Sequence, residues 1–148
     1  MKEGIVAAEV IGGLNSYADY HAIPAAIFTD PEIATVGLSV NQANSMGIQV
    51  ITGKFPFNAS GRALASNEPE GFARVIADKN TQRIIGFEIV GREASDLIAE
   101  ATLAIEMGAT LEDISLTVHA HPTMPEVILE SSENALGKAI HIVNKRGS

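Results

Sequence analysis

The residues best suited to chemistry in this chain lie in one short segment, Val118 to Glu126, with the sequence VHAHPTMPE. The segment contains two of the four histidines, and a glutamate follows the second histidine by five residues. A histidine titrates near neutral pH, so it can both take and return a proton. A carboxylate on its other ring nitrogen fixes the tautomer and stabilises the imidazolium. The segment therefore offers His121 as a general base that Glu126 orients.

The same segment also supports a structural interpretation. Thr123 and Glu126 have the spacing of a capping box for a following helix, and Pro125 suits the first turn because its missing N–H costs nothing there. The two interpretations do not exclude each other. A glutamate that turns back to cap the backbone cannot, however, fully serve a histidine as well, so both interpretations stay open at this point.

Other ligand-binding motifs are missing from the sequence. His119 and His121 would share one face of a strand, but no cysteine and no third ligand stands at a recognisable spacing, so we expect no metal site. Gly53-Lys54 lacks the earlier glycine and the following Ser or Thr of a phosphate loop, and no G-x-G-x-x-G fingerprint occurs. We therefore expect this chain alone to bind neither metal nor nucleotide.

The elements that must position the histidine segment follow from residue patterning. Short connections between strands favour an antiparallel sheet with helices gathered on one side, which is an α+β domain. Alternation and turn residues predict strands over 25–29, 33–37 and 48–57 and a hairpin of strands 72–77 and 83–90, with a connection over 58–69. Caps and helical spacing predict helices over 1–15, 40–46 and 93–107, a short helix after Thr110 and a helix from about 125 to 142.

Composition restricts the class of protein. The 148 residues are enough for one domain, and 46% hydrophobic with 19% charged residues suits a packed core. No apolar run reaches the about 18 residues that span a bilayer. The absence of cysteine excludes disulfides and a cysteine nucleophile within this chain. A net charge of −8 would repel polyanions, so we expect neither nucleic acid nor an anionic membrane surface as a partner.

Several stretches are those of a known enzyme family: EGIVAAE at 3–9, DYHAIPAAIFTDPEIATVG at 19–37, GKFPF at 53–57, HAHPTMPE at 119–126 and GKAIH at 137–141. Over nearly its whole length the chain resembles the C-terminal interface, or dimerisation, domain of the dihydrolipoamide dehydrogenases. These belong to the FAD- and NAD-dependent pyridine nucleotide-disulfide oxidoreductases.

This resemblance implies a function for the histidine segment. In the family, electrons pass from dihydrolipoamide through a cysteine pair and FAD to NAD. The histidine matching His121 is the proton acceptor beside the cysteine pair of the partner subunit, the glutamate matching Glu126 orients it, and a cis peptide precedes the proline matching Pro122, which would lie near the partner's flavin. The resemblance thus implies a cytoplasmic homodimer, with the acyltransferase core of a 2-oxoacid dehydrogenase complex as a further partner.

The resemblance also divides the chain. Residues 1–18 would be the last helix and linker of a preceding FAD domain, residues 19–143 the dimerisation domain, and residues 144–148 a tail. Since the cysteine pair and both glycine-rich loops are missing, we expect the isolated chain to hold no cofactor and to be inactive.

Two alternatives remain. One is the interface domain of a related reductase, although mercuric reductases usually carry a C-terminal cysteine pair and glutathione reductases generally lack HAHPT. The other is a stand-alone dimerising module.

Overall fold

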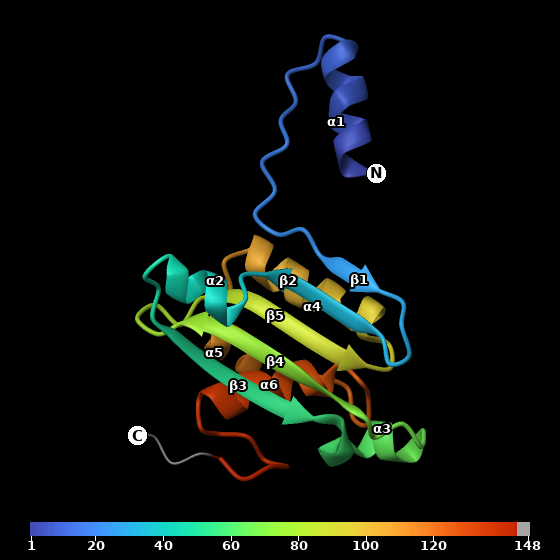
Figure 1. The fold of residues 1–148 in the computed structure, drawn as a ribbon, viewed down its shortest axis with the longest axis vertical. Helices are drawn as coiled ribbons and strands as arrows, with labels where there is room; N and C mark the ends of the chain where they lie inside the picture. Colours follow the sequence, from blue (N-terminus) through green and yellow to red (C-terminus); the bar gives the residue numbers. More distant parts are fainter. Residues whose placement is uncertain (145–148) are drawn as a thin grey trace.

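A five-stranded antiparallel sheet forms the centre of the molecule, with strand order β1-β2-β5-β4-β3 (Figure 1). The structure is a computed structural model that describes residues 1–144, so all of the predicted tail except Asn144 lies outside the described residues. The strands are β1 (Ala25–Ile27), β2 (Ile33–Gly37), β3 (Val50–Pro56), β4 (Gly71–Asp78) and β5 (Ile84–Gly91). The helices are α1 (Lys2–Ile11), α2 (Val40–Ser45), the 3-10 turn η1 (Phe57–Ala59), α3 (Gly61–Ala65), α4 (Ala94–Glu106), α5 (Leu111–Leu116) and α6 (Glu126–Ala135).

Helices α4, α5 and α6 lie together behind the sheet in Figure 1. Helix α4 packs on β5 and β2, α6 packs on β3 and β4, and α5 packs on α6. One face of the sheet is thus covered, because α4 and α6 share it between them. The α+β class predicted from the sequence, with an antiparallel sheet and helices on one side, is confirmed.

The core lies between this sheet face and the helices, as strand alternation requires. On β4, Ala73, Val75 and Ala77 are buried, while Phe72 and Arg74 are only partly buried. Ile76 is also buried, but it lies outside the main core cluster that contains the other three. Successive side chains of a strand point to opposite faces, so the first three residues face the helices. The same face of the sheet and the facing helices bury the largest apolar side chains of the core, Phe55, Phe57, Phe87, Ile89, Leu111, Val127 and Ile128.

A glycine in β3 brings α6 close to the sheet. A Cβ at Gly53 would lie 2.0 Å from the carbonyl oxygen of Ser131 and 2.4 Å from the backbone nitrogen of Ala135. Only glycine therefore permits this approach. Next to it, the Asn134 side-chain oxygen accepts the backbone N–H of Lys54 at 3.0 Å on this edge strand. These contacts determine where α6 lies, and α6 carries two of the acidic residues described below.

Helix α1 stands clear of the sheet and is joined to it by residues 12–24 (Figure 1). It has no buried residue, although Ile5, Val10 and Ile11 are exposed apolar side chains. An exposed apolar helix surface of this kind is suited to packing on another surface.

The last helix is shorter than the sequence pattern predicts. We expected helix from about 125 to 142, but α6 ends at Ala135. The left-handed Gly137, at φ 71°, reverses the chain, and the N–H of Lys138 donates to the Glu133 carbonyl at 2.8 Å. This is a glycine-terminated helix end. The apolar residues beyond it belong to a separate segment, residues 139–144.

Two smaller predictions are also wrong. The connection predicted over 58–69 contains α3, whose first turn is capped by the Ser60 hydroxyl accepting the Ala63 N–H at 3.3 Å. Strand β1 ends at Ile27 rather than residue 29, because the Thr29 hydroxyl already bonds the Pro31 carbonyl within the turn. Neither difference changes the fold class.

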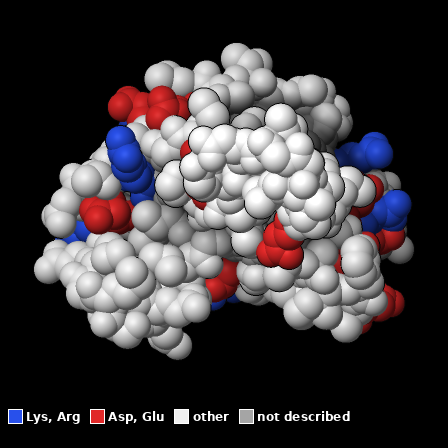
Figure 2. Space-filling model, turned by 90° about the horizontal axis from the view of Figure 1, so that it is seen from above, with Lys and Arg blue, Asp and Glu red and all other residues white. Residues whose placement is uncertain are grey.

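Charged side chains are sparse on the face drawn in Figure 2, and the few Lys and Arg side chains there lie beside acidic ones. Such pairing also occurs at Arg92, which contacts both Glu68 and Glu93. In residues 1–144 no helix is long and apolar enough to cross a bilayer.

Candidate active site

The histidine segment forms the loop between α5 and α6. Helix α5 begins with a capping box in which the Thr110 hydroxyl accepts the Asp113 N–H and the Asp113 carboxylate accepts the Thr110 N–H. The peptide bond between His121 and Pro122 is cis, as the family resemblance implied. The loop therefore turns sharply at the predicted catalytic histidine, just before α6.

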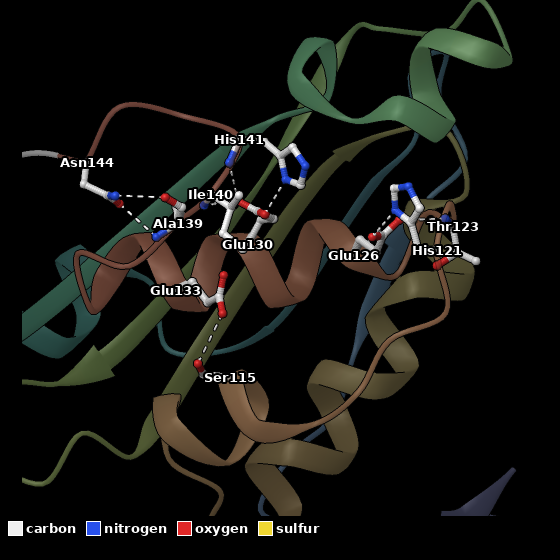
Figure 3. A network of polar contacts seen from close by, with 10 residues as sticks. All are labelled: Ser115, His121, Thr123, Glu126, Glu130, Glu133, Ala139, Ile140, His141 and Asn144. Atoms are coloured by element: carbon white, nitrogen blue, oxygen red, sulfur yellow. Dashed lines mark hydrogen bonds and ion pairs between the residues drawn. The ribbon is translucent and has the colours of Figure 1, made fainter.

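His121 and Glu126 lie in contact, as predicted (Figure 3). The His121 Nδ1 is 2.8 Å from the Glu126 Oε1, while the Glu126 Oε2 accepts the backbone N–H of Thr123 at 2.8 Å. The two oxygens of one carboxylate thus serve the histidine and the backbone together. Our expectation that one glutamate cannot fill both roles was wrong, because the two contacts use different oxygens.

The capping-box interpretation holds only in part. In a capping box the threonine hydroxyl would accept a backbone N–H, but the Thr123 hydroxyl donates to the Ala120 carbonyl at 2.6 Å. Helix α6 begins at Glu126 with Pro125 as its N-cap and no side-chain cap. Glu126 therefore stabilises the loop before the helix, and the reciprocal half of the box is not formed.

The Glu126 carboxylate is held in its ionised form. Burial raises its pKa, but the Thr123 N–H, the His121 hydrogen bond and the charges of His121 and His141 together lower it below the usual 4.5. An ionised carboxylate can only accept, so the Nδ1 of His121 must carry a proton. Since the His121 side chain is 70% exposed, its Nε2 faces outward and can accept a proton from a ligand.

His119 has a different environment. Its side chain is only 5% exposed, with Nε2 2.8 Å from the Glu100 Oε1 of α4 and Nδ1 2.9 Å from the Thr117 carbonyl oxygen. Both ring nitrogens are used within the fold, so His119 connects the loop to α4. It does not join His121 in a cluster: among residues 1–144 no three His, Asp or Glu side chains are arranged to hold a metal ion.

A second imidazole–carboxylate pair adjoins the first and was missed by sequence reasoning. The His141 Nδ1 lies 2.6 Å from the Glu130 Oε1 (Figure 3), and both pairs line one hollow of about 190 Å³ that Phe55 and Leu64 close on the apolar side. A usable signal existed: Glu130 is one helical turn after Glu126, on the side of α6 that also carries buried Val127.

A larger hollow, of about 750 Å³, lies elsewhere, along the start of β5 and the end of α4. Its carboxylate, Glu106, already accepts the backbone N–H groups of His21 and Ala22 at 3.0 and 2.9 Å. This carboxylate stabilises the chain entering β1. The smaller hollow beside His121 is lined by two imidazole–carboxylate pairs, so we place the candidate site there.

Comparison with known families gives an independent assignment. The model of the pyridine nucleotide-disulphide oxidoreductase dimerisation domain matches residues 23–132. The chain belongs to this family. Dihydrolipoyl dehydrogenase 3 of Haloarcula marismortui is 61% identical over 140 residues, covering 95% of this chain and 29% of that protein. Dihydrolipoyl dehydrogenase of Halobacterium salinarum is 55% identical over 144 residues, covering 97% of this chain and 30% of that protein.

Among solved structures, LpdA from Mycobacterium tuberculosis superposes with a TM-score of 0.79 at 25% identity, over 89% of this chain and 29% of that one. The fold of this chain is thus similar to that of a part of LpdA. The chain spans about 30% of the length of the curated relatives it matches.

The residues of this domain do not fit a dinucleotide cofactor. Every strand pairing in the described part of the chain is antiparallel, whereas dinucleotide sites use parallel strands with a glycine-rich turn into a helix. No such turn occurs in the sequence. FAD and NAD would therefore have to be bound by other parts of a parent protein.

Proposed function

We propose that this chain is the dimerisation domain of an FAD-dependent dihydrolipoamide dehydrogenase, in which His121 exchanges protons during NAD-linked dihydrolipoamide oxidation. One observation carries the proposal: His121 is fixed through Nδ1 by Glu126, while its ring is largely exposed. The family match and the dihydrolipoyl dehydrogenase relatives support this substrate over glutathione or mercuric ion.

The proposed chemistry of this chain is proton transfer at one atom. A thiol must lose its proton before its sulfur reacts, because the thiolate is the nucleophile. The His121 Nε2 would accept that proton from a dihydrolipoamide thiol and later return it. The Glu126 carboxylate would hold the ring in the correct tautomer and stabilise the imidazolium while it carries the proton.

The reacting sulfurs must come from elsewhere, since this chain has no cysteine. We infer a homodimer in which His121 reaches the disulfide site of the other subunit, with Pro122 near its flavin. Exposed apolar side chains near the site support such packing: Leu116 is 74%, Val118 96% and Val143 93% exposed. A two-fold dimer needs only one self-complementary surface of this kind.

The parent protein would supply the remaining parts. We propose that residues 1–18 belong to a preceding FAD domain, that residues 19–143 form the dimerisation domain, and that the parent is cytoplasmic and docks on the acyltransferase core of a 2-oxoacid dehydrogenase complex. The exposed apolar surface of α1 is consistent with a missing neighbouring domain. A stand-alone dimerising module would leave that surface unexplained.

The test is to express the complete open reading frame that contains this chain and to measure flavin absorbance and dihydrolipoamide-dependent NAD⁺ reduction. We expect a yellow homodimer with activity, and neither flavin nor activity from the 148-residue chain alone. A parent without flavin, or one that reduces glutathione disulfide but ignores dihydrolipoamide, would overturn the proposal.

A further inference from the structure

Glu130 is the only charged side chain that is buried among the described residues, at 4% exposure. An ionised carboxylate in the interior is costly unless hydrogen bonds and charges replace the lost water. Helix α6 could have carried an apolar residue here, next to buried Val127 and Ser131. The contacts of Glu130 should therefore explain why an acidic residue stands at this position.

All of these contacts come from the segment after α6. The Glu130 Oε2 accepts the backbone N–H groups of Ile140 and His141 at 3.2 and 3.3 Å, and its Oε1 lies 2.6 Å from the His141 Nδ1. The Asn144 side chain closes the same segment by bonding both the N–H and the carbonyl of Ala139, at 3.0 and 2.9 Å. Residues 139–144, the C-terminal segment, are thus attached to α6 through one carboxylate.

The attachment places His141 beside the candidate active site. His141 and His121 line the same hollow, and each is held through Nδ1 by a carboxylate of α6 (Figure 3). The influence of His141 extends to Glu126. Burial raises the pKa of Glu126, whereas its hydrogen bonds and the charges of both histidines lower it. The charge of His141 thus acts on the carboxylate that orients His121.

We propose that Glu130 and His141 are positioning residues of this site: Glu130 anchors the C-terminal segment so that the His141 imidazole forms a wall of the hollow, beside the Glu126 carboxylate that orients His121. The inference concerns this chain's own residues and holds whether or not the parent is a dihydrolipoamide dehydrogenase.

Other charges around His141 must be considered. Glu126 and Glu133 lie on α6 with Glu130, Lys138 precedes the segment, and Arg62 is the ionisable residue of α3. Burial and the neighbouring Glu130 raise the pKa of Glu133, so this carboxyl carries its charge less readily than Glu126. None of these groups is altered by the substitutions below, so they contribute equally to all variants.

The test is an NMR titration of the Glu126 carboxyl group in the 148-residue chain, in wild type, H141Q and H141K. Removing the charge in H141Q should raise the titration midpoint of Glu126, because the positive charge of His141 lowers the pKa of that carboxyl group. H141K keeps a positive charge, so the midpoint should stay at or below the wild-type value. Because the His141 side chain is half exposed, we expect both variants to fold.

H21Q is the matched control, because His21 lies in the larger hollow along β5 and α4 and does not line that of His121. It should leave the Glu126 midpoint unchanged, because His21 is not among the groups that shift the pKa of Glu126. An equal midpoint in H141Q and wild type, or the same change in H141Q and H141K, would overturn the proposal. Neither outcome depends on flavin, substrate or a partner subunit, so a failure here is distinct from a failure of the proposed function.

The anchoring step has its own measurement, which is hydrogen–deuterium exchange at the backbone amides of Ile140 and His141. Glu130→Ala removes their acceptor, so we expect exchange at both amides to accelerate at least tenfold while the amides of β4 stay protected. If those two amides exchange at wild-type rates in the folded variant, Glu130 is not the anchor. Should Glu130→Ala not fold, Glu130→Gln weakens the contact more mildly, and a smaller acceleration at the same two amides is expected.

Discussion

Two histidines stand two residues apart in one loop, and each contacts a glutamate at 2.8 Å, yet their environments are opposite. His119 is 5% exposed and uses both ring nitrogens, one on Glu100 and one on the Thr117 carbonyl. His121 is 70% exposed and uses one nitrogen on Glu126. A carboxylate partner alone therefore does not mark a catalytic histidine. The nitrogen left facing solvent distinguishes a base from a structural contact.

The carboxylates differ in the same way. Glu100 reaches His119 from α4, which is a different part of the fold, whereas Glu126 lies five residues after its histidine, at the start of α6. The first pair therefore ties two elements together. The second pair is local and orients a ring within one turn of chain. The difference predicts that changes at His119 affect stability and that changes at His121 affect turnover.

The largest effect is expected for His121→Gln in the full-length parent. Glutamine keeps similar size and one hydrogen bond but cannot take up a proton, so turnover should fall at least about 100-fold, the lower end for general acid–base catalysis. Stability should change by less than about 0.5 kcal/mol because the side chain is exposed. Steady-state rates, with flavin content and dimerisation checked, measure this. Near-normal turnover would remove the basis for the comparison.

His119→Gln should show the reverse pattern. Losing one of two ring contacts in a buried position leaves the Glu100 carboxylate or the Thr117 carbonyl short of a donor, at a cost of about 1–2 kcal/mol in unfolding free energy. Turnover should stay within about threefold of wild type, because the ring does not face the hollow. Urea denaturation of this chain and steady-state rates of the parent give the two values. A turnover loss equal to that of His121→Gln would contradict the distinction.

Glu126→Gln should have an intermediate effect on turnover, about tenfold. Glutamine can still accept from the Thr123 N–H and contact the ring, but it no longer stabilises the imidazolium by charge. The base itself remains, so the loss should be smaller than for His121→Gln. The pH profile of the rate is the sharper measurement. Its acidic limb should move, because the imidazolium of His121 is less stable without the Glu126 charge. An unchanged profile would show that Glu126 only stabilises the loop.

The smallest effect concerns acid stability. The pKa of Glu126 is lower than its usual 4.5 despite burial, owing to the hydrogen bonds from Thr123 and His121, so its contribution to stability is present above pH 4.5 and is lost as pH falls through the folded-state pKa. The difference in unfolding free energy between wild type and Glu126→Gln should therefore become smaller as the pH falls below 4.5. Urea midpoints between pH 3 and 6 measure it.

Glu133→Gln provides a control of opposite sign. Burial and Glu130 raise the pKa of Glu133, so its ionisation opposes folding at neutral pH. Wild type should gain stability relative to this variant as pH falls toward 4.5. The same direction for both variants would show that general acid unfolding, not the individual carboxyl groups, determines the response.

Much of the fold was predictable because its signals are local. The capping box of Ser39 and Gln42 forms as expected, and β2 has the predicted bounds. The alternation of Ala73, Val75 and Ala77 gave the buried face of β4. The end of α6 was wrong because Leu136, Ala139 and Ile140 continue an apolar pattern past Gly137. Periodicity reports which side chains need burial, and it does not show that a left-handed glycine reverses the chain between them.

The sequence by itself determined the fold class, the family and the pairing of His121 with Glu126, because these depend on residues close together along the chain. Only the tertiary structure decided that one carboxylate serves both a histidine and a backbone N–H, that His119 is bound on both nitrogens, and that Glu130 joins His141. The partners of those two histidines are 19 and 11 residues away. The packing of α4 and the reversal after α6 bring them together, and no local spacing encodes such contacts.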